Sequence, residues 1–165
     1  MRIIFDIDKT ILFCFDRHGN SIWAKQLVPP FKLCGEEKLI DDVGSVCFIA
    51  EGLVNFLKEL SSQGRELSYL SVGRHYELPE EFQPSLLALK IFNLLELFNE
   101  QSLLAYKNYK KRDYLESVVE HVLLIDDDDN VLNEARQLEH VHTIDAKKIT
   151  NWELINTLNL INLQQ

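Results

Sequence analysis

Two neighbouring carboxylates stand directly after the first apolar run of the chain, in the stretch FDIDKT. Asp6 and Asp8 follow the run Arg2 to Phe5, where neither side chain is easily buried. A second group, DDDD from Asp126 to Asp129, follows another apolar run, HVLLI. Carboxylates packed together repel one another, so some of them must take up a proton or hold a cation. Their hard oxygen atoms suit Mg²⁺, which keeps several waters and often also binds a substrate phosphate.

The same carboxylates also point to covalent chemistry. Aspartate is among the side chains that act as nucleophiles in covalent catalysis. An anionic carboxylate and an anionic phosphate repel each other, and a bound Mg²⁺ offsets that repulsion. The pattern therefore indicates phosphoryl transfer to an aspartate at a magnesium site.

Short apolar runs alternate along the chain with segments of helical periodicity, which predicts a parallel sheet covered on both faces. In such a sheet ligands bind beyond the carboxyl ends of the strands, so we expect Asp6, Ser71 and Asp126 to meet in one cleft. The expected strands are 2–5, 65–72, 121–125 and 141–144. The expected helices are 50–64, 84–98, 110–119, 131–138 and 151–161.

Residues 11–49 do not follow this alternation. FDRHGNSIW, residues 15–23, predicts a small hairpin around Gly19 and Asn20, and KLIDDVGSVCFI, residues 38–49, predicts a second. The two prolines of LVPPF, residues 27–31, exclude a helix there. We therefore expect one domain, 1–165, with 11–49 as a small flap of hairpins instead of a large lid.

Composition narrows the functional class. The net charge is −9, from 17 basic and 26 acidic side chains, which argues against binding to nucleic acid or an anionic membrane. The three cysteines lack C-x-x-C spacing, as expected for reduced thiols. No signal peptide and no apolar run of about 18 residues is visible. These features favour a cytoplasmic location, and we expect a monomer.

The order of the motifs resembles the haloacid dehalogenase superfamily of phosphohydrolases. D-x-D-x-T follows the first strand, a serine the second, a lysine precedes a helix, and D-D follows a further strand. The features SVGR, LVPPF and LLIDDDDNVLNEARQLEHVHTIDAKKIT are similar to the small magnesium-dependent phosphatases that lack a large cap. The resemblance covers almost the whole chain and implies a Rossmann-like three-layer α/β/α sandwich.

The resemblance also implies roles for individual residues. Asp6 would form an aspartyl-phosphate, Asp8 would be the general acid and then the base, and its backbone carbonyl would reach the metal. Thr10 would support the turn and orient Asp8. The metal site would comprise Asp6, Asp8, Asp126 and Asp127, with Mg²⁺ as cofactor.

Substrate contacts and a catalytic lysine complete this set. Ser71 would hydrogen-bond the phosphoryl oxygens, and the substrate-binding residues would be Thr10, Ser71, Val72, Gly73 and Arg74. The catalytic set would be Asp6, Asp8, Ser71 and a lysine. KNYKKRDYL offers Lys107, Lys110 and Lys111 for that lysine, and the family pattern fits Lys110 best.

The carboxylic acid at position 8 can protonate an alkoxide or phenoxide leaving group, which favours phosphatase over dehalogenase chemistry. An open site admits a phosphorylated protein side chain, so phosphotyrosine in proteins is the first expected substrate. A small phosphate ester such as a sugar phosphate is the second. A non-catalytic binding module with the same fold is the third reading, although such modules typically lose Asp6 or Asp8, which this chain retains.

Overall fold

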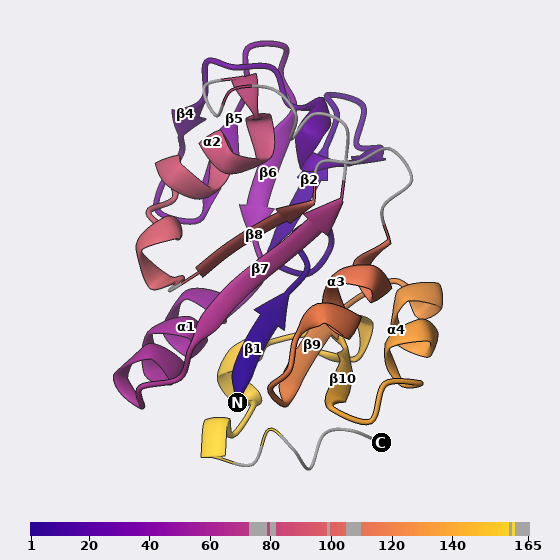
Figure 1. Cartoon of the computed structure of the whole chain (residues 1–165). Coiled ribbons are helices and arrows are strands. Elements are labelled where there is room, and N and C mark those ends of the chain that lie inside the picture. Colours follow the sequence, from indigo (N-terminus) through magenta and orange to yellow (C-terminus); the bar gives the residue numbers. More distant parts are fainter. Residues whose placement is uncertain (73–78, 80–81, 99, 105–109, 159, 161–165) are drawn as a thin grey trace.

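The apolar runs form a parallel sheet in the computed structural model, which describes the chain apart from residues 73–78, 80–81, 99, 105–109, 159 and 161–165 (Figure 1). The strand order is β10-β9-β1-β7-β8, and each neighbouring pair is parallel. The strands are β1 (Arg2–Phe5), β7 (Leu67–Val72), β8 (Glu100–Leu104), β9 (Val122–Asp126) and β10 (Val141–Asp145). The four strands expected from the apolar runs are confirmed, and β8 is an addition at the edge of the sheet.

Both faces of this sheet are covered, as the fully apolar strands predict. Ile3 and Phe5 of β1 belong to one buried cluster, and Ile4 between them belongs to another. The first cluster includes the buried face of α1 (Leu53–Ser62), and the second includes Leu115 of α3 (Lys111–Ser117) and Ala135 of α4 (Asp129–Ala135). The chain is therefore a mixed α/β protein with a parallel sheet between helices.

The expected helix 84–98 is much shorter than the apolar pattern suggests. The segment 84–98 forms α2 (Pro84–Ile91), followed by the 3₁₀ turn η4 (Leu95–Leu97). Asn93 has a φ of 57° and ends the helix, because asparagine tolerates the left-handed conformation that closes a helix.

The expected closing helix 151–161 is wrong over its described residues. There the chain forms the 3₁₀ turn η6 (Trp152–Leu154). The side chain of Asn151 accepts a hydrogen bond from the backbone N–H of Glu153, and Asn156 does the same with Leu158. Such local side-chain bonds compete with helical ones.

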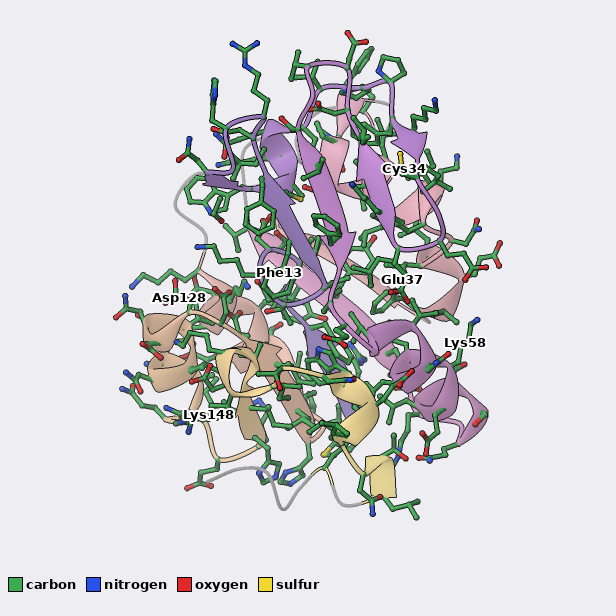
Figure 2. The ribbon with its side chains drawn as sticks, turned by 180° about the vertical axis from the view of Figure 1, so that it is seen from behind. Phe13, Cys34, Glu37, Lys58, Asp128 and Lys148 are labelled. Carbon is green, nitrogen blue, oxygen red and sulfur yellow. The ribbon has the colours of Figure 1, made fainter. Side chains whose placement is uncertain are left out.

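Residues 12–49 form a second sheet, which is antiparallel, with the order β3-β2-β6-β5-β4 (Figure 1). Its elements are β2 (Leu12–Phe15), β3 (Ser21–Ile22), the 3₁₀ turn η1 (Ala24–Gln26), β4 (Lys32–Leu33), β5 (Lys38–Ile40) and β6 (Val46–Ile49). Both expected hairpins are present. The sequence did not predict that β2 pairs with β6, which joins the hairpins into one sheet. The side chains of β2 alternate, so that Cys14 is buried while Phe13 faces outward (Figure 2).

The second sheet shares its core with the first. Leu39 and Cys47 belong to the same buried cluster as Phe5, and Leu86 and Leu89 of α2 join them. In Figure 1, α2 lies beside β4 and β5. The insertion is thus a packed sheet with its own covering helix, which is more than the small flap expected from the sequence.

A close backbone contact fixes the segment after β10, which contains the 3₁₀ turn η5 (Ala146–Lys148) and η6. Gly52, at the start of α1, has a φ of 74°, and a Cβ there would lie 2.4 Å from the side-chain oxygen of Asn151. Trp152 is buried against Phe5 and Phe56 and donates its backbone N–H to Glu51. Glycine is therefore required at position 52 for this approach.

Candidate active site

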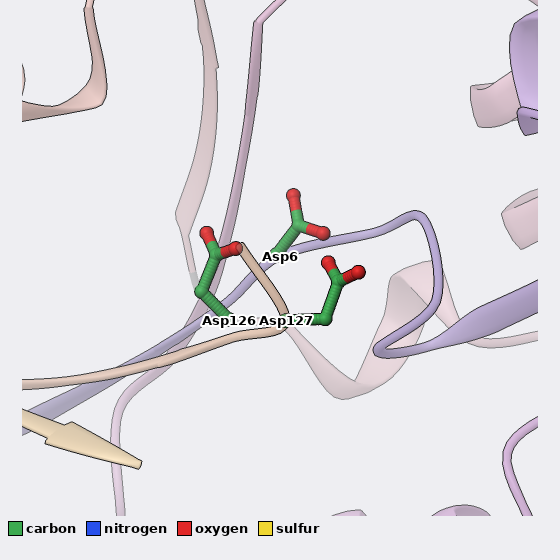
Figure 3. A group of neighbouring side chains, drawn as sticks. All are labelled: Asp6, Asp126 and Asp127. Carbon is green, nitrogen blue, oxygen red and sulfur yellow. The ribbon is translucent and has the colours of Figure 1, made fainter. Parts of the chain in front are cut away.

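Three carboxylates meet where β1 and β9 end, as the strand order requires. The backbone N–H of Asp6 donates to the carbonyl of Ile125 at 2.8 Å, which ties the two strand ends together. One oxygen from each of Asp6, Asp126 and Asp127 lies within 4.8 Å of the others (Figure 3). Asp6 and Asp126 are buried and Asp127 is half-buried. Three hard oxygen donors at this spacing are a candidate metal site.

Lys111 brings a positive charge to this cluster. Its Nζ lies 2.5 Å from a carboxylate oxygen of Asp6 and 2.6 Å from one of Asp126. The expectation of Lys110 at this place is corrected, because the Nζ of Lys110 lies 3.3 Å from Glu134 at an exposed position. Lys110 is the residue before α3 and has extended backbone angles, whereas Lys111 opens the helix. One step along the chain therefore decides which side chain reaches the carboxylates.

The four consecutive aspartates have four different contacts. Asp126 accepts from Lys111 and from the backbone N–H of Asp128, and Asp127 faces the cluster. Asp128 caps α4 by accepting from the N–H groups of Asn130 and Val131. Asp129 is exposed and forms an ion pair of 2.7 Å with Lys147. Only the first two members of the run are therefore available to a metal.

Asp8 is held by the inserted sheet and is not part of the three-carboxylate cluster. One of its carboxylate oxygens accepts the backbone N–H of Ala24, the first residue of η1, at 2.6 Å. The hydroxyl of Thr10 is buried and has no hydrogen-bond partner within the described chain. The group that orients the Asp8 side chain is thus Ala24, where the sequence pointed to Thr10.

A cavity of about 540 Å³ opens over the cluster. Asp6, Asp8, Lys111 and Asp127 line it together with Ser71 at the end of β7. The further lining residues are Lys9, Trp23, Lys25, Val72, Lys110, Asp128, Asn130, Val131 and Glu134. The expected meeting of Asp6, Ser71 and Asp126 is present in part: Asp6 and Ser71 line the cavity, whereas from the third strand end Asp127 lines it and Asp126 is a buried member of the carboxylate cluster.

Two expected substrate contacts, Gly73 and Arg74, lie outside the described residues. Thr10 does not line the cavity, whereas Val72 does. Trp23 of the insertion lines the carboxylate cavity, whereas Pro29, Pro30 and Phe31 line a different cavity. That second cavity lies between the insertion and α2, so the proline segment packs away from the carboxylates.

Burial dominates the electrostatics of the site. Burial, reinforced by the charge of Asp126, raises the pKa of Asp6, while Lys111 opposes that rise. Burial also raises the pKa of Asp8, and the Ala24 hydrogen bond opposes it. Burial by itself lowers the pKa of Lys111, but the charges of Asp6 and Asp126 outweigh it and raise that pKa overall. The lysine is therefore held as a cation between the carboxylates.

Sequence reasoning missed three features of the cavity wall. Lys111 was an open alternative, but nothing in the sequence indicated Ala24 as the partner of Asp8. No signal in the sequence indicated Lys9 and Lys25 either, which line the cavity. Lys9 has a φ of 59°, and a positive φ at a non-glycine residue occurs often at functional turns.

Comparisons with known proteins add little to this geometry. No family model matches the chain, and no curated protein does. A solved crystal structure matches 95% of this chain and 75% of its own, with 19% sequence identity and a TM-score of 0.43. Within the described part of the chain, none of the helices is both long and apolar enough to cross a membrane.

Proposed function

We propose that the chain is a magnesium-dependent phosphomonoester hydrolase of the haloacid dehalogenase type, acting on phosphotyrosine in proteins. One observation carries the proposal: Asp6, Asp8, Lys111, Ser71 and Asp127 line a single cavity at the carboxyl ends of parallel strands. The helices on both faces of the parallel sheet agree with the three-layer sandwich of that superfamily.

The donor set fits Mg²⁺. Asp6, Asp126 and Asp127 would hold it, since Mg²⁺ prefers carboxylate oxygens and keeps its remaining positions for water and phosphate. When bound, the ion would neutralise charge on the phosphoryl oxygens and polarise them. Asp126 is 1% exposed and already accepts from Lys111 and Asp128, so it is fixed in place before any ligand arrives.

In the first step, a carboxylate oxygen of Asp6 attacks phosphorus and the bond from phosphorus to the leaving oxygen breaks. Asp8 gives its proton to that oxygen, and the alcohol or phenol departs. Lys111 contacts the attacking group and balances its charge. Ser71, which lines the same cavity, would donate its hydroxyl to a phosphoryl oxygen.

In the second step, a water molecule attacks the phosphorus of the aspartyl-phosphate. Asp8, now a carboxylate, takes a proton from the water, the bond from phosphorus to Asp6 breaks, and inorganic phosphate is released. The hydrogen bond from Ala24 keeps the Asp8 carboxylate in place through both steps. The two aspartates therefore have separate roles, and only Asp6 becomes covalently modified.

A substrate panel tests the proposal. The purified chain is assayed with Mg²⁺, and again with EDTA, against phosphotyrosine peptides, phosphoserine peptides of the same sequence and a set of sugar phosphates. We expect hydrolysis only with Mg²⁺ and a higher kcat/KM for phosphotyrosine, because its ring carries the phosphate down an open cavity to Asp6. Full turnover in EDTA would contradict the metal mechanism. Equal rates on phosphoserine, or a preference for sugar phosphates, would replace the phosphotyrosine assignment with a small-metabolite phosphatase.

A further inference from the structure

The anchoring of Asp8 fixes the side of the cavity on which a leaving group must lie. Because Asp8 protonates the leaving oxygen, that oxygen lies within hydrogen-bond reach of its carboxylate. The carboxylate in turn is held at 2.6 Å by the backbone N–H of Ala24. The residues on either side of Ala24, Trp23 and Lys25, both line the cavity. The group attached to the phosphate therefore leaves the site past these two side chains.

This wall of the cavity is aromatic and cationic. Trp23 is 51% exposed, and the Nζ of Lys25 lies 4.1 Å from the centre of its ring. Such a contact holds the ammonium group over the ring face. Lys9 stands beside them, and the described residues offer neither lysine a carboxylate within ion-pair distance. Asp8 attracts both lysines over a longer distance, and neither is engaged in a close ion pair with a described carboxylate, so in a chain of net charge −9 both can still bind an anionic ligand.

Other lining residues of the cavity are acidic. They are Asp127, Asp128 and Glu134, and Lys110 is already paired with Glu134. A second hollow of about 350 Å³ shares Lys9 and Trp23 with the main cavity. An acidic group attached to the substrate is thus attracted to Lys9 and Lys25 and repelled by these carboxylates.

We propose that Lys9, Trp23 and Lys25 form a leaving-group subsite that selects phosphotyrosine next to acidic residues in a peptide. The tyrosine ring packs on Trp23, and a neighbouring carboxylate pairs with Lys25 or Lys9. This inference rests on the proposed function and deepens it by naming the substrate class. An acidic phosphotyrosine peptide and a small bisphosphate share one feature, a phosphate ester with a second negative charge nearby.

The test compares two phosphotyrosine peptides. One carries Asp and Glu beside the phosphotyrosine, and the other carries Asn and Gln at the same positions. We expect the wild-type kcat/KM to favour the acidic peptide, and Lys25→Gln to lower that preference by about two- to fivefold, the range for a partly exposed ion pair. Lys9→Asn, which keeps a residue tolerant of positive φ, should act in the same direction. The matched control is Lys58→Gln, which makes the same charge change on α1, on the other side of the molecule from Asp128 (Figure 2).

A binding measurement separates this inference from the hydrolysis itself. In the Asp6→Asn variant, iodide quenching of tryptophan fluorescence reports on Trp23, because Trp152 is 2% exposed. The acidic phosphopeptide should protect Trp23 from iodide at lower concentration than the neutral one, and Lys25→Gln should remove that difference. Binding that depends on Lys25, together with no turnover by the wild-type chain, would keep the subsite and overturn the proposed hydrolysis.

Three outcomes would overturn the subsite. The first is equal kcat/KM and equal binding for the two peptides in the wild-type chain. The second is an equal loss of preference in Lys25→Gln and Lys58→Gln, which would indicate only long-range charge. The third is a Lys25-dependent preference for a sugar bisphosphate over the acidic peptide, which would assign the subsite to small molecules.

Discussion

The two sheets of the molecule bury their strands in different ways. Every residue of β9 is buried, and in β1 only Arg2 is partly exposed. In the antiparallel sheet the pattern alternates: Cys14 and Cys47 are buried, whereas Phe13 and Phe48 are each 37% exposed. The parallel sheet is an interior layer, and the antiparallel sheet has one face in the core and one in solvent.

This difference separates two tasks. The parallel sheet ends in Asp6 and Asp126, whose positions follow from strands buried on both faces, so that the reacting groups stand on a fixed base. The antiparallel sheet contributes the segment with Trp23 and Lys25, which is open to solvent and to a substrate. The hydrogen bond between Asp8 and Ala24 connects the two regions. Reaction chemistry is thus expected to depend on the first sheet and substrate choice on the second.

The largest effect should come from the nucleophile. Asp6→Asn keeps the shape of the side chain but removes its charge, and we expect turnover to fall by at least about 10⁴-fold, in the range for loss of a covalent nucleophile. The matched control is Asp42→Asn, the same change at an exposed turn of the antiparallel sheet, which should retain activity. Steady-state rates on an aryl phosphate measure both. Similar losses in the two variants would mean that the parallel sheet has no special role.

The general acid should give the next largest effect, and it should depend on the leaving group. Asp8→Asn should lower kcat for an alkyl phosphate by about 10²- to 10⁴-fold, the usual contribution of a positioned acid. The loss should be smaller for nitrophenyl phosphate, because nitrophenolate needs little protonation. Equal losses on the two substrates would argue against Asp8 as the acid.

Lys111 and Lys110 are neighbours in the sequence, but the side chain of Lys111 is nearly buried and that of Lys110 is exposed. Lys111→Met should lower activity by about 10²-fold or more, as for the loss of one preorganised charge donor. Without metal it should also lower the free energy of unfolding by about 3–5 kcal/mol, because Asp6 and Asp126 stay buried without a positive charge beside them. Lys110→Met removes an ion pair whose lysine side chain is 66% exposed, and both quantities should change little. Steady-state kinetics and chemical denaturation in EDTA compare the two variants. Larger losses in Lys110→Met than in Lys111→Met would assign the catalytic role to Lys110.

The smallest effect tests the connection between the sheets. Ala24→Pro removes the N–H that binds Asp8, at the first position of η1, where proline is tolerated. Trp23 already has the extended angles required before proline, φ −82° and ψ 149°. We expect about a 10-fold loss for the alkyl phosphate, from one hydrogen bond to a charged group. Nitrophenyl phosphate serves as the internal control, and thermal denaturation checks that the variant folds. An unchanged ratio of the two rates would show that the insertion does not position Asp8.

Particular residues show what the sequence could predict. The places of Asp6 and Asp126 followed from apolar strands, whose carboxyl ends must share one edge of a parallel sheet. The choice between Lys110 and Lys111 depended on where a helix begins, and boundaries are the least certain part of a sequence-based assignment. The contact between Asp8 and Ala24 spans 16 positions. The hairpin that returns the chain was predicted, but no local pattern indicated that the first N–H of η1 would reach the Asp8 carboxylate.

The most direct test of the account is whether Asp6 becomes phosphorylated. The chain is mixed with a phosphotyrosine peptide and Mg²⁺, quenched in acid within the first turnover, and analysed by mass spectrometry of the intact protein and of its peptides. The account predicts a mass increase of one phosphoryl group, located on Asp6, present with Mg²⁺ and missing with EDTA or in Asp6→Asn. Rapid hydrolysis with no phosphorylated protein, or a phosphoryl group on any other residue, would contradict it.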